Sequence, residues 1–132
     1  MKIVLVAVVL LTLLSADGFE VHGSLIYDSK TELSWEAKPS STKMKWKEAV
    51  EYCERLELRL PNLYELKSLV DYKKYNPAIR TNLIDIRTDD YYWSSSVYTN
   101  DSSRAWRVYF YYGNDYWGNK TRTHYVLCVS GQ

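Results

Sequence analysis

The chain has 132 residues, of which 46% are hydrophobic, 25% charged and 15% aromatic, and its net charge is +1. This length predicts a single domain, and the composition is that of a globular protein with unusually many tyrosines. The near-zero net charge gives no reason to expect a nucleic acid or a membrane surface as a partner. The function must therefore be sought in local patterns.

The N-terminus has the layout of a secretory signal peptide. A basic start is followed by a twelve-residue apolar run from Ile3 to Leu14 and then by small residues. The run is shorter than the roughly 20 residues that span a bilayer, so we expect no transmembrane anchor after cleavage. We assign residues 1–18 to the signal peptide, with cleavage after either Ala16 or Gly18.

Export makes the two cysteines, Cys53 and Cys128, informative. An oxidising compartment favours pairing them in a disulfide. Two buried free thiols and an intermolecular bridge remain as alternatives. An intramolecular bridge would close a long loop, and the chain-entropy account assigns such a loop on the order of 4 kcal/mol of stabilisation.

The first part of the domain is predicted to be a hairpin. Residues 19–23 have little pattern and are expected to form a short leader. Residues 25–27 and 33–35 alternate apolar and polar side chains on either side of a turn at 28–31, which places Trp35 inward. A polar loop is expected over residues 37–43.

The first helix is predicted over residues 44–56. Its apolar residues recur with a 3.6-residue period and define one buried face that includes Cys53. The face consists of Trp46, Ala49, Val50, Cys53 and Leu56.

A second helix is predicted to start after Pro61. Asn62 is expected to be its N-cap, and Glu65 three residues later nearly completes a capping box. Its apolar stripe is Leu63, Leu66, Leu69 and Val70, and the helix is expected to fray over residues 71–74.

The C-terminal part of the chain is predicted to be an antiparallel sheet beginning at Tyr91. A connection without clear periodicity, residues 76–90, precedes it, with Leu83, Ile84 and Ile86 expected to reach the core. In the strand around residues 106–110, alternation places two sets of side chains on opposite faces. The inward set is Trp106, Val108 and Phe110, and the outward set is Arg107, Tyr109 and Tyr111. The closing strand is expected over residues 124–129.

Five motifs in register resemble the bacterial domain of unknown function 1566, the C-terminal domain of the Legionella collagen-like adhesin. The resemblance covers about residues 24–131 and includes the opening strand at 28–35. The motifs are Trp46-Lys47-Glu48-Ala49-Val50-Glu51-Tyr52-Cys53, Arg59-Leu60-Pro61-Asn62-Leu63-Tyr64-Glu65-Leu66, Tyr92-Trp93-Ser94-Ser95-Ser96, Ala105-Trp106-Arg107-Val108-Tyr109-Phe110 and Tyr125-Val126-Leu127-Cys128-Val129.

The resemblance implies an α+β, C-type-lectin-like fold over residues 24–132. This fold has two helices flanking a small, irregular antiparallel sheet and one disulfide, here Cys53–Cys128. It also implies a bacterial protein exported to the periplasm or cell exterior, since members of the family are exported. Some members belong to adhesins that bind sulfated glycans. One departure is that Glu57-Leu58 replaces the glycine-bearing loop and the tryptophan that often precede Arg-Leu-Pro. The calcium-dependent sugar motifs of animal lectins are also absent.

The sequence favours binding over catalysis. His22 lies in the leader, and His124, on a strand, is expected to be structural. The cysteines are expected to be paired, so neither is available as a nucleophile. No convergent catalytic set is therefore evident. We therefore expect no enzymatic activity and no cofactor. Calcium remains a possible ligand, because loop residues carry hard oxygens, although their spacing matches no calcium motif. These residues are Asp89, Asp90, Asn100, Asp101, Asn114 and Asp115.

The candidate binding surface combines aromatic and basic side chains. Exposed aromatic rings stack on sugars, and arginine makes bidentate contacts to sulfate or carboxylate groups. A glycan or a protein could be the ligand. Alternatively, the tyrosines are cross-strand pairs that only hold the sheet together. The candidate residues are Arg104, Arg107, Tyr109, Tyr111, Tyr116 and Trp117.

Overall fold

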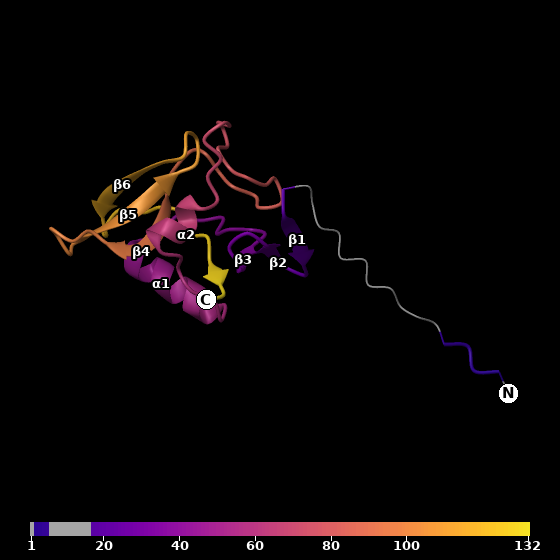
Figure 1. Ribbon diagram of the computed structural model, residues 1–132. Coiled ribbons are helices and arrows are strands. Elements are labelled where there is room, and N and C mark those ends of the chain that lie inside the picture. The colour runs from indigo at the N-terminus through magenta and orange to yellow at the C-terminus, as the bar shows by residue number, and fades with distance from the viewer. Residues whose placement is uncertain (1, 6–16) are drawn as a thin grey trace.

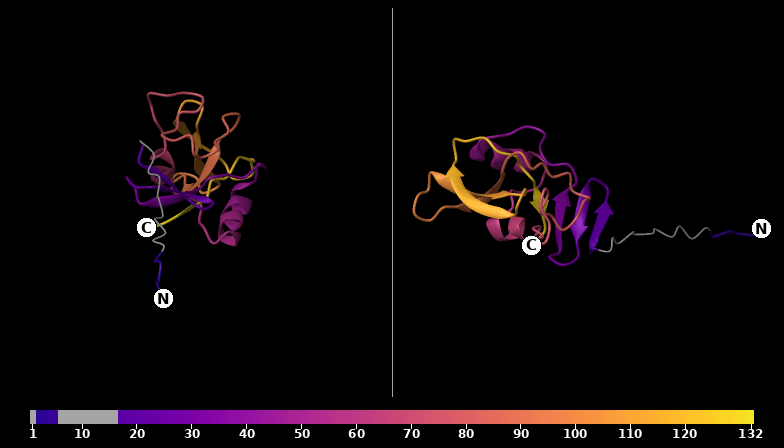
Figure 2. Two further views of the ribbon diagram at one scale, coloured as in Figure 1. Left: turned by 90° about the vertical axis from the view of Figure 1, so that its right-hand side faces the viewer. Right: turned by 90° about the horizontal axis from the view of Figure 1, so that it is seen from above.

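The computed structural model describes residues 2–5 and 17–132. The predicted signal peptide therefore lies mostly outside the described residues. Two small antiparallel sheets occupy the two ends of the domain, and α2 lies between them (Figures 1 and 2). The elements are β1 (Phe19–His22), β2 (Leu25–Asp28), β3 (Leu33–Glu36), α1 (Trp46–Arg55), α2 (Leu63–Lys67), β4 (Tyr92–Val97), β5 (Arg104–Tyr109), β6 (Asn114–Asn119) and β7 (Val129–Ser130).

The first sheet has the order β1-β2-β3-β7 and contains the predicted hairpin as β2 and β3. Residues 19–22, expected to be a leader with little pattern, instead form the edge strand β1. The reason is Phe19, which is fully buried and lies under the Arg80 guanidinium, 4.8 Å from the ring centroid. Arg80 is itself paired with the buried Asp28, so distant residues fix this strand.

The main core lies between the two sheets. Trp35 faces it and is fully buried, as the hairpin pattern predicts. The connection over residues 76–90 is irregular and closes one side of this core. Ile84 is buried, as predicted, while Leu83 and Ile86 are partly buried and pack against it.

Helix α1 packs over β4 and forms a second, smaller core with the disulfide. Cys53 and Cys128 are bonded, which confirms the intramolecular pairing. Ala49 and Cys53 are buried, as the helical period predicts. Leu56, predicted on the same face, is 46% exposed, because the helix ends at Arg55 and the chain turns away there.

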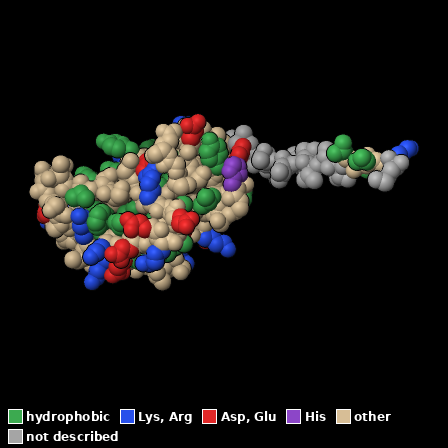
Figure 3. Space-filling view, turned by 90° about the horizontal axis from the view of Figure 1, so that it is seen from below, with side chains coloured by type: hydrophobic (Ala, Val, Ile, Leu, Met, Phe, Trp, Pro, Cys, Tyr) green, Lys and Arg blue, Asp and Glu red, His purple; other side chains and the backbone are tan. Residues whose placement is uncertain are grey.

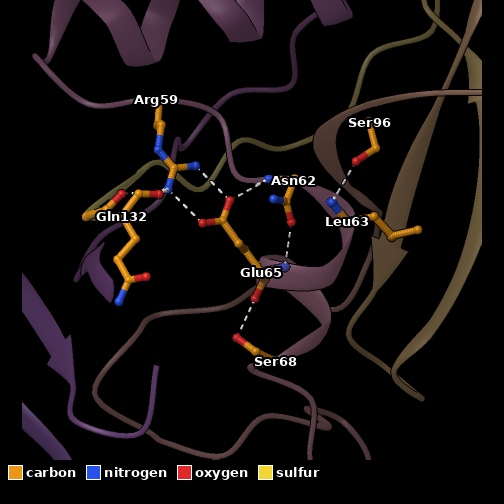
Figure 4. Close-up of polar contacts among 8 residues, drawn as sticks. Arg59, Asn62, Leu63, Glu65, Ser68, Ser96 and Gln132 are labelled. Carbon is orange, nitrogen blue, oxygen red and sulfur yellow. Dashed lines mark hydrogen bonds and ion pairs between the residues drawn. The ribbon is translucent and has the colours of Figure 1, made fainter. Parts of the chain in front are cut away.

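Helix α2 begins with the predicted capping box. The Asn62 side chain accepts a hydrogen bond from the Glu65 N–H, and the Glu65 carboxylate accepts one from the Asn62 N–H. The same carboxylate pairs with both terminal nitrogens of Arg59, which also donates to the Gly131 carbonyl (Figure 4). This short helix is therefore tied to the C-terminal end of the chain.

The second sheet has the order β4-β5-β6, with a bulge in β4 between Trp93 and Val97. Val108 and Phe110 are fully buried, as predicted. Trp106 lies on their face of β5 but is only half-buried, contrary to prediction. It lies beyond the core and contacts the Tyr98 ring. The structure thus confirms an α+β domain with two helices and one disulfide, but divides the predicted single sheet into two.

Candidate functional site

The structure divides the six candidate binding residues between the two faces of the β4-β5-β6 sheet. Arg107 lies opposite Tyr116 across the β5–β6 pair, so these side chains share a face. Tyr109 follows Arg107 by two residues and shares that face as well. Arg104 and Trp117 lie on the opposite face. We call these the Arg107 face and the Trp117 face.

Four tyrosine rings continue from Arg107 along its face. The Arg107 guanidinium lies 4.0 Å from the Tyr91 ring centroid, a cation–π contact. The next ring centroids follow at 5.1 Å (Tyr91–Tyr109), 6.0 Å (Tyr109–Tyr111) and 4.6 Å (Tyr111–Tyr112). We call these four rings the tyrosine ladder. Tyr112, at its far end, is 64% exposed.

An open hollow of about 600 Å³ adjoins the other side of Arg107. Its lining is mostly polar, with two guanidinium groups, two threonines and one carboxylate. Arg122 is exposed, and its side chain has no ion pair or hydrogen bond with any residue in the described ranges. This Arg107 hollow is lined by Asp90, Tyr91, Arg107, Thr121, Arg122, Thr123 and His124.

A chain of hydrogen bonds fixes Arg107 at the edge of this hollow. Its Nη1 lies 2.7 Å from His124 Nε2, and His124 Nδ1 lies 2.7 Å from Asp90 Oδ1. Because an arginine can only donate, Nε2 must accept, and Nδ1 therefore carries the proton that is donated to Asp90. Lys43 pairs with the other oxygen of Asp90 at 3.1 Å. This arrangement requires a neutral imidazole.

The pKa shifts agree with that protonation state. Burial lowers the pKa of His124, and the Asp90 carboxylate only partly offsets this effect. Burial would raise the pKa of Asp90, but hydrogen bonds from the Tyr91 N–H, Lys43 and His124 together lower it below its ordinary value. Burial also lowers the pKa of Arg107. Asp90 is therefore the anion that compensates the positive charges around it.

Gly118 allows Arg107 to lie flat on the sheet. A Cβ at this position would lie 2.7 Å from Arg107 Nε and 2.8 Å from Cζ. The guanidinium thus occupies the space of the missing side chain. Within the described ranges, its buried Nε has no hydrogen-bond partner, and its Nη2 has none either. Nη2 is the donor that remains for a ligand.

The Trp117 face is a self-contained aromatic cluster. The Trp117 ring is stacked on Tyr98 at 5.6 Å, and the Arg104 guanidinium lies 3.8 Å from its centroid. Trp106 packs edge-on against Tyr98. The Trp117 ring is therefore contacted by both Tyr98 and Arg104. Tyr116 belongs by register to the Arg107 face, but its ring reaches Trp117 at 5.0 Å around the edge of β6.

Three of the candidate calcium ligands have partners within the protein. Asp89 accepts from the Tyr125 hydroxyl, Asp101 contacts Arg104, and Asp115 pairs with Lys67. Residues 2–5 and 17–132 contain no group of three or more His, Cys, Asp or Glu side chains that could hold a metal ion. These three carboxylates therefore stabilise loops and strand ends of the fold.

Sequence patterns reveal only part of this site. They mark Tyr91 as the start of the sheet and Asp90 as a possible calcium ligand. They predict a structural His124, whereas its ring also orients Arg107. They do not single out Arg122, because the site joins three separate stretches of chain.

On the α1 side of the molecule, charges of both signs are mixed. Figure 3, which views the molecule from the side of α1, shows basic side chains interspersed with acidic ones. At the Arg107 hollow, two guanidinium groups accompany a single carboxylate, Asp90, and the Arg122 side chain forms no ion pair with any described residue. The Arg107 hollow is therefore a local concentration of positive charge on a nearly neutral protein.

Fold and site together define a small, disulfide-linked α+β domain with a basic and aromatic sheet surface. The model of the Lcl C-terminal domain family matches residues 24–130, and the chain belongs to that family. This confirms the resemblance to the C-terminal domain of the Legionella collagen-like adhesin and makes the chain an adhesin-related module. No curated protein and no solved structure matches the chain. None of the helices in the described part is both long and apolar enough to span a bilayer.

Proposed function

We propose that this protein is an exported, non-enzymatic binding module that recognises an acidic glycan of the cell envelope or the extracellular surroundings. The ligand would lie on the Arg107 face, with its acidic group at the Arg107 hollow and its sugar rings along the tyrosine ladder. The observation that carries this proposal is the continuity of Arg107 with four tyrosine rings.

The chemistry of the hollow supports an anionic group such as sulfate or carboxylate. Arg107 Nη2 and the Arg122 guanidinium are donors without partners among the described residues. The hydroxyls of Thr121 and Thr123 add neutral donors at the rim. A charge-assisted hydrogen bond contributes about 1.5–3 kcal/mol, so two arginines could hold one acidic group firmly.

The arrangement of the ladder supports a chain of sugar rings rather than one compact group. Aromatic faces pack against the apolar faces of sugars, and tyrosine adds a hydroxyl for hydrogen bonding. The rings are already ordered by their mutual contacts, so binding costs little side-chain entropy. An extended oligosaccharide can contact several of these rings at once.

The proposal includes a C-type-lectin-like fold and export. Two features support the fold: the early strand β3 pairs with the last strand β7, and the disulfide joins the first helix to the residue before β7. The signal-peptide layout, the disulfide and the adhesin-related family support a periplasmic or extracellular location.

A glycan array tests the proposal. The mature protein is applied beside Arg107→Ala/Tyr109→Ala, and acidic and neutral glycans are compared. We expect binding to sulfated or carboxylated glycans by the wild type, with loss of signal in the double variant. Arg122→Ala should weaken binding, and Lys47→Ala, which removes a positive charge from the exposed face of α1, should not. Absence of binding to every glycan would reject the proposal.

A second candidate function is a protein-interaction or structural module of the bacterial envelope. It is favoured by the strongly exposed tyrosines of the 71–76 loop and the ladder end, because exposed aromatic residues are frequent interface hot spots. These are Tyr72, Tyr75 and Tyr112. This function predicts that the protein self-associates on a sizing column or co-purifies with one partner, and that Tyr72→Ser/Tyr75→Ser abolishes the association.

A further inference from the structure

A second hollow, of about 710 Å³, lies on a different part of the molecule, away from the Arg107 face. It is bounded by the β1–β2 turn, the end of β3 and the C-terminal end of α1. Its walls are largely apolar and include Leu25, Leu56 and Leu58. Leu56 is the residue that the helical period places on the buried face but that remains 46% exposed. The end of α1 at Arg55 thus leaves an apolar side chain free to line this hollow.

Glu36 supplies the one acidic group of this hollow. It lies at the end of β3 and is only 8% exposed. Its Oε1 accepts a hydrogen bond of 2.7 Å from the Cys128 N–H. No residue of the described ranges donates to its Oε2 or forms an ion pair with the carboxylate. A buried carboxylate without a cation is costly, so this environment favours an incoming positive charge.

The surrounding groups leave that charge uncompensated. Burial raises the pKa of Glu36, and the hydrogen bond from the Cys128 N–H offsets this only in part. Lys38 lies on the rim, but it is exposed and makes no ion pair with Glu36. A purely structural role, in which Glu36 holds the backbone beside the disulfide, accounts for Oε1. It does not account for Oε2, which accepts no hydrogen bond from any described residue.

We propose that this hollow, with Glu36 as its acidic group and Leu25, Leu56 and Leu58 in its walls, binds a lysine side chain of a partner polypeptide. The four-carbon stem of lysine would pack against the leucine walls, and its ammonium group would reach Glu36 Oε2. Lysine fits better than arginine because only one carboxylate oxygen is free. A guanidinium prefers to bind both oxygens at once, whereas an ammonium is a compact point charge.

The test is a titration of the ¹⁵N-labelled mature protein with Nα-acetyl-lysine methylamide, followed by amide chemical shifts. The Cys128 amide, which donates to Glu36, is the reporter. The matched probe is Nα-acetyl-norleucine methylamide, which keeps the apolar stem and lacks the ammonium. Glu36→Gln removes the charge while keeping an oxygen that can accept from Cys128. Nα-acetyl-arginine methylamide tests the preference for lysine.

We expect saturable shifts at Cys128 with the lysine probe. The norleucine probe should bind the wild type about tenfold more weakly, and the lysine probe should bind Glu36→Gln about tenfold more weakly. A tenfold loss corresponds to the loss of one charge-assisted hydrogen bond. Leu56→Ala should also weaken binding of the lysine probe. Because Leu56 is exposed, this variant replaces Glu36→Gln as the test if Glu36→Gln does not fold. No saturable shift, equal binding of norleucine, or tighter binding of arginine would each overturn the proposal. Because these residues lie outside the Arg107 face, the outcome is independent of the glycan experiment.

Discussion

Arg107 donates a hydrogen bond to His124, with 2.7 Å between Nη1 and Nε2, and this contact fixes the protonation state of the imidazole. A second proton on His124 would place two donors against each other. The residues that face His124 include Asp90, Arg107 and Arg122, so one carboxylate is set against two cations. The orientation of Arg107 therefore depends on a neutral His124.

The first prediction concerns pH. His124 titrates in the folded protein at a pKa below its ordinary value of about 6.5. The unfolded state then binds more protons in that interval, so the free energy of unfolding falls as the pH falls from about 6.5 through the folded pKa. Urea unfolding between pH 7 and pH 5 measures this. His124→Gln, which stays neutral, should flatten the dependence, and an unchanged slope would contradict this account.

The second prediction concerns Gly118. Gly118→Ala places a methyl group where the Arg107 guanidinium lies, so Arg107 must move and lose its contact with His124. We expect a loss of stability of about 1 kcal/mol, the value of one hydrogen bond, and weaker glycan binding. Asn119→Ala, at the exposed neighbouring position of the same strand, is the control. Equal glycan affinity of Gly118→Ala and wild type would show that the position of Arg107 is unimportant.

The third prediction concerns the disulfide. Cys53 and Cys128 are separated by 75 residues, and both are fully buried. Removing the bridge in Cys53→Ala/Cys128→Ala should lower the free energy of unfolding by about 4 kcal/mol, because the unfolded chain regains its loop entropy. Non-reducing peptide mapping should find the two cysteines joined. A double variant as stable as the wild type would show that the bridge adds nothing to stability.

The fourth prediction concerns the cleavage site of the signal peptide. The Gly18 carbonyl accepts hydrogen bonds from both the backbone N–H and the hydroxyl of Ser29, and Asp17 Oδ1 accepts from the Phe19 N–H. Cleavage after Ala16 preserves these contacts, whereas cleavage after Gly18 removes them. We therefore expect the exported protein to start at Asp17, which an intact mass measurement tests. A start at Phe19 would show that these contacts do not determine the mature N-terminus.

Local patterns predict the elements that depend on neighbouring residues. The Asn62–Glu65 capping box spans four residues, and the buried face of α1 follows from its helical period. Trp35 and Val108 are likewise buried where strand alternation places them. Each of these features is determined within one segment, which is why the sequence alone reveals it.

Features that depend on distant partners are not predictable in this way. Phe19 is buried because Arg80, some sixty residues away, lies over its ring and pairs with Asp28. Trp106 leaves the core because Tyr98 and its strand partner Trp117 hold it at the sheet surface. The separation of the six candidate binding residues onto two faces also depends on partners in another strand. The register between β5 and β6 decides on which face of the sheet a side chain lies.

The central claim is that the Arg107 face, and not the Trp117 face, binds the glycan. The most direct measurement compares the dissociation constants of Arg107→Ala/Tyr109→Ala and Arg104→Ala/Trp117→Ala for one array-selected acidic oligosaccharide. Circular dichroism first verifies that both variants fold. Our account predicts a loss of affinity of about tenfold or more in the first variant, as expected for a lost charge-assisted contact, and little change in the second. Equal losses, or a loss confined to the second variant, would contradict it.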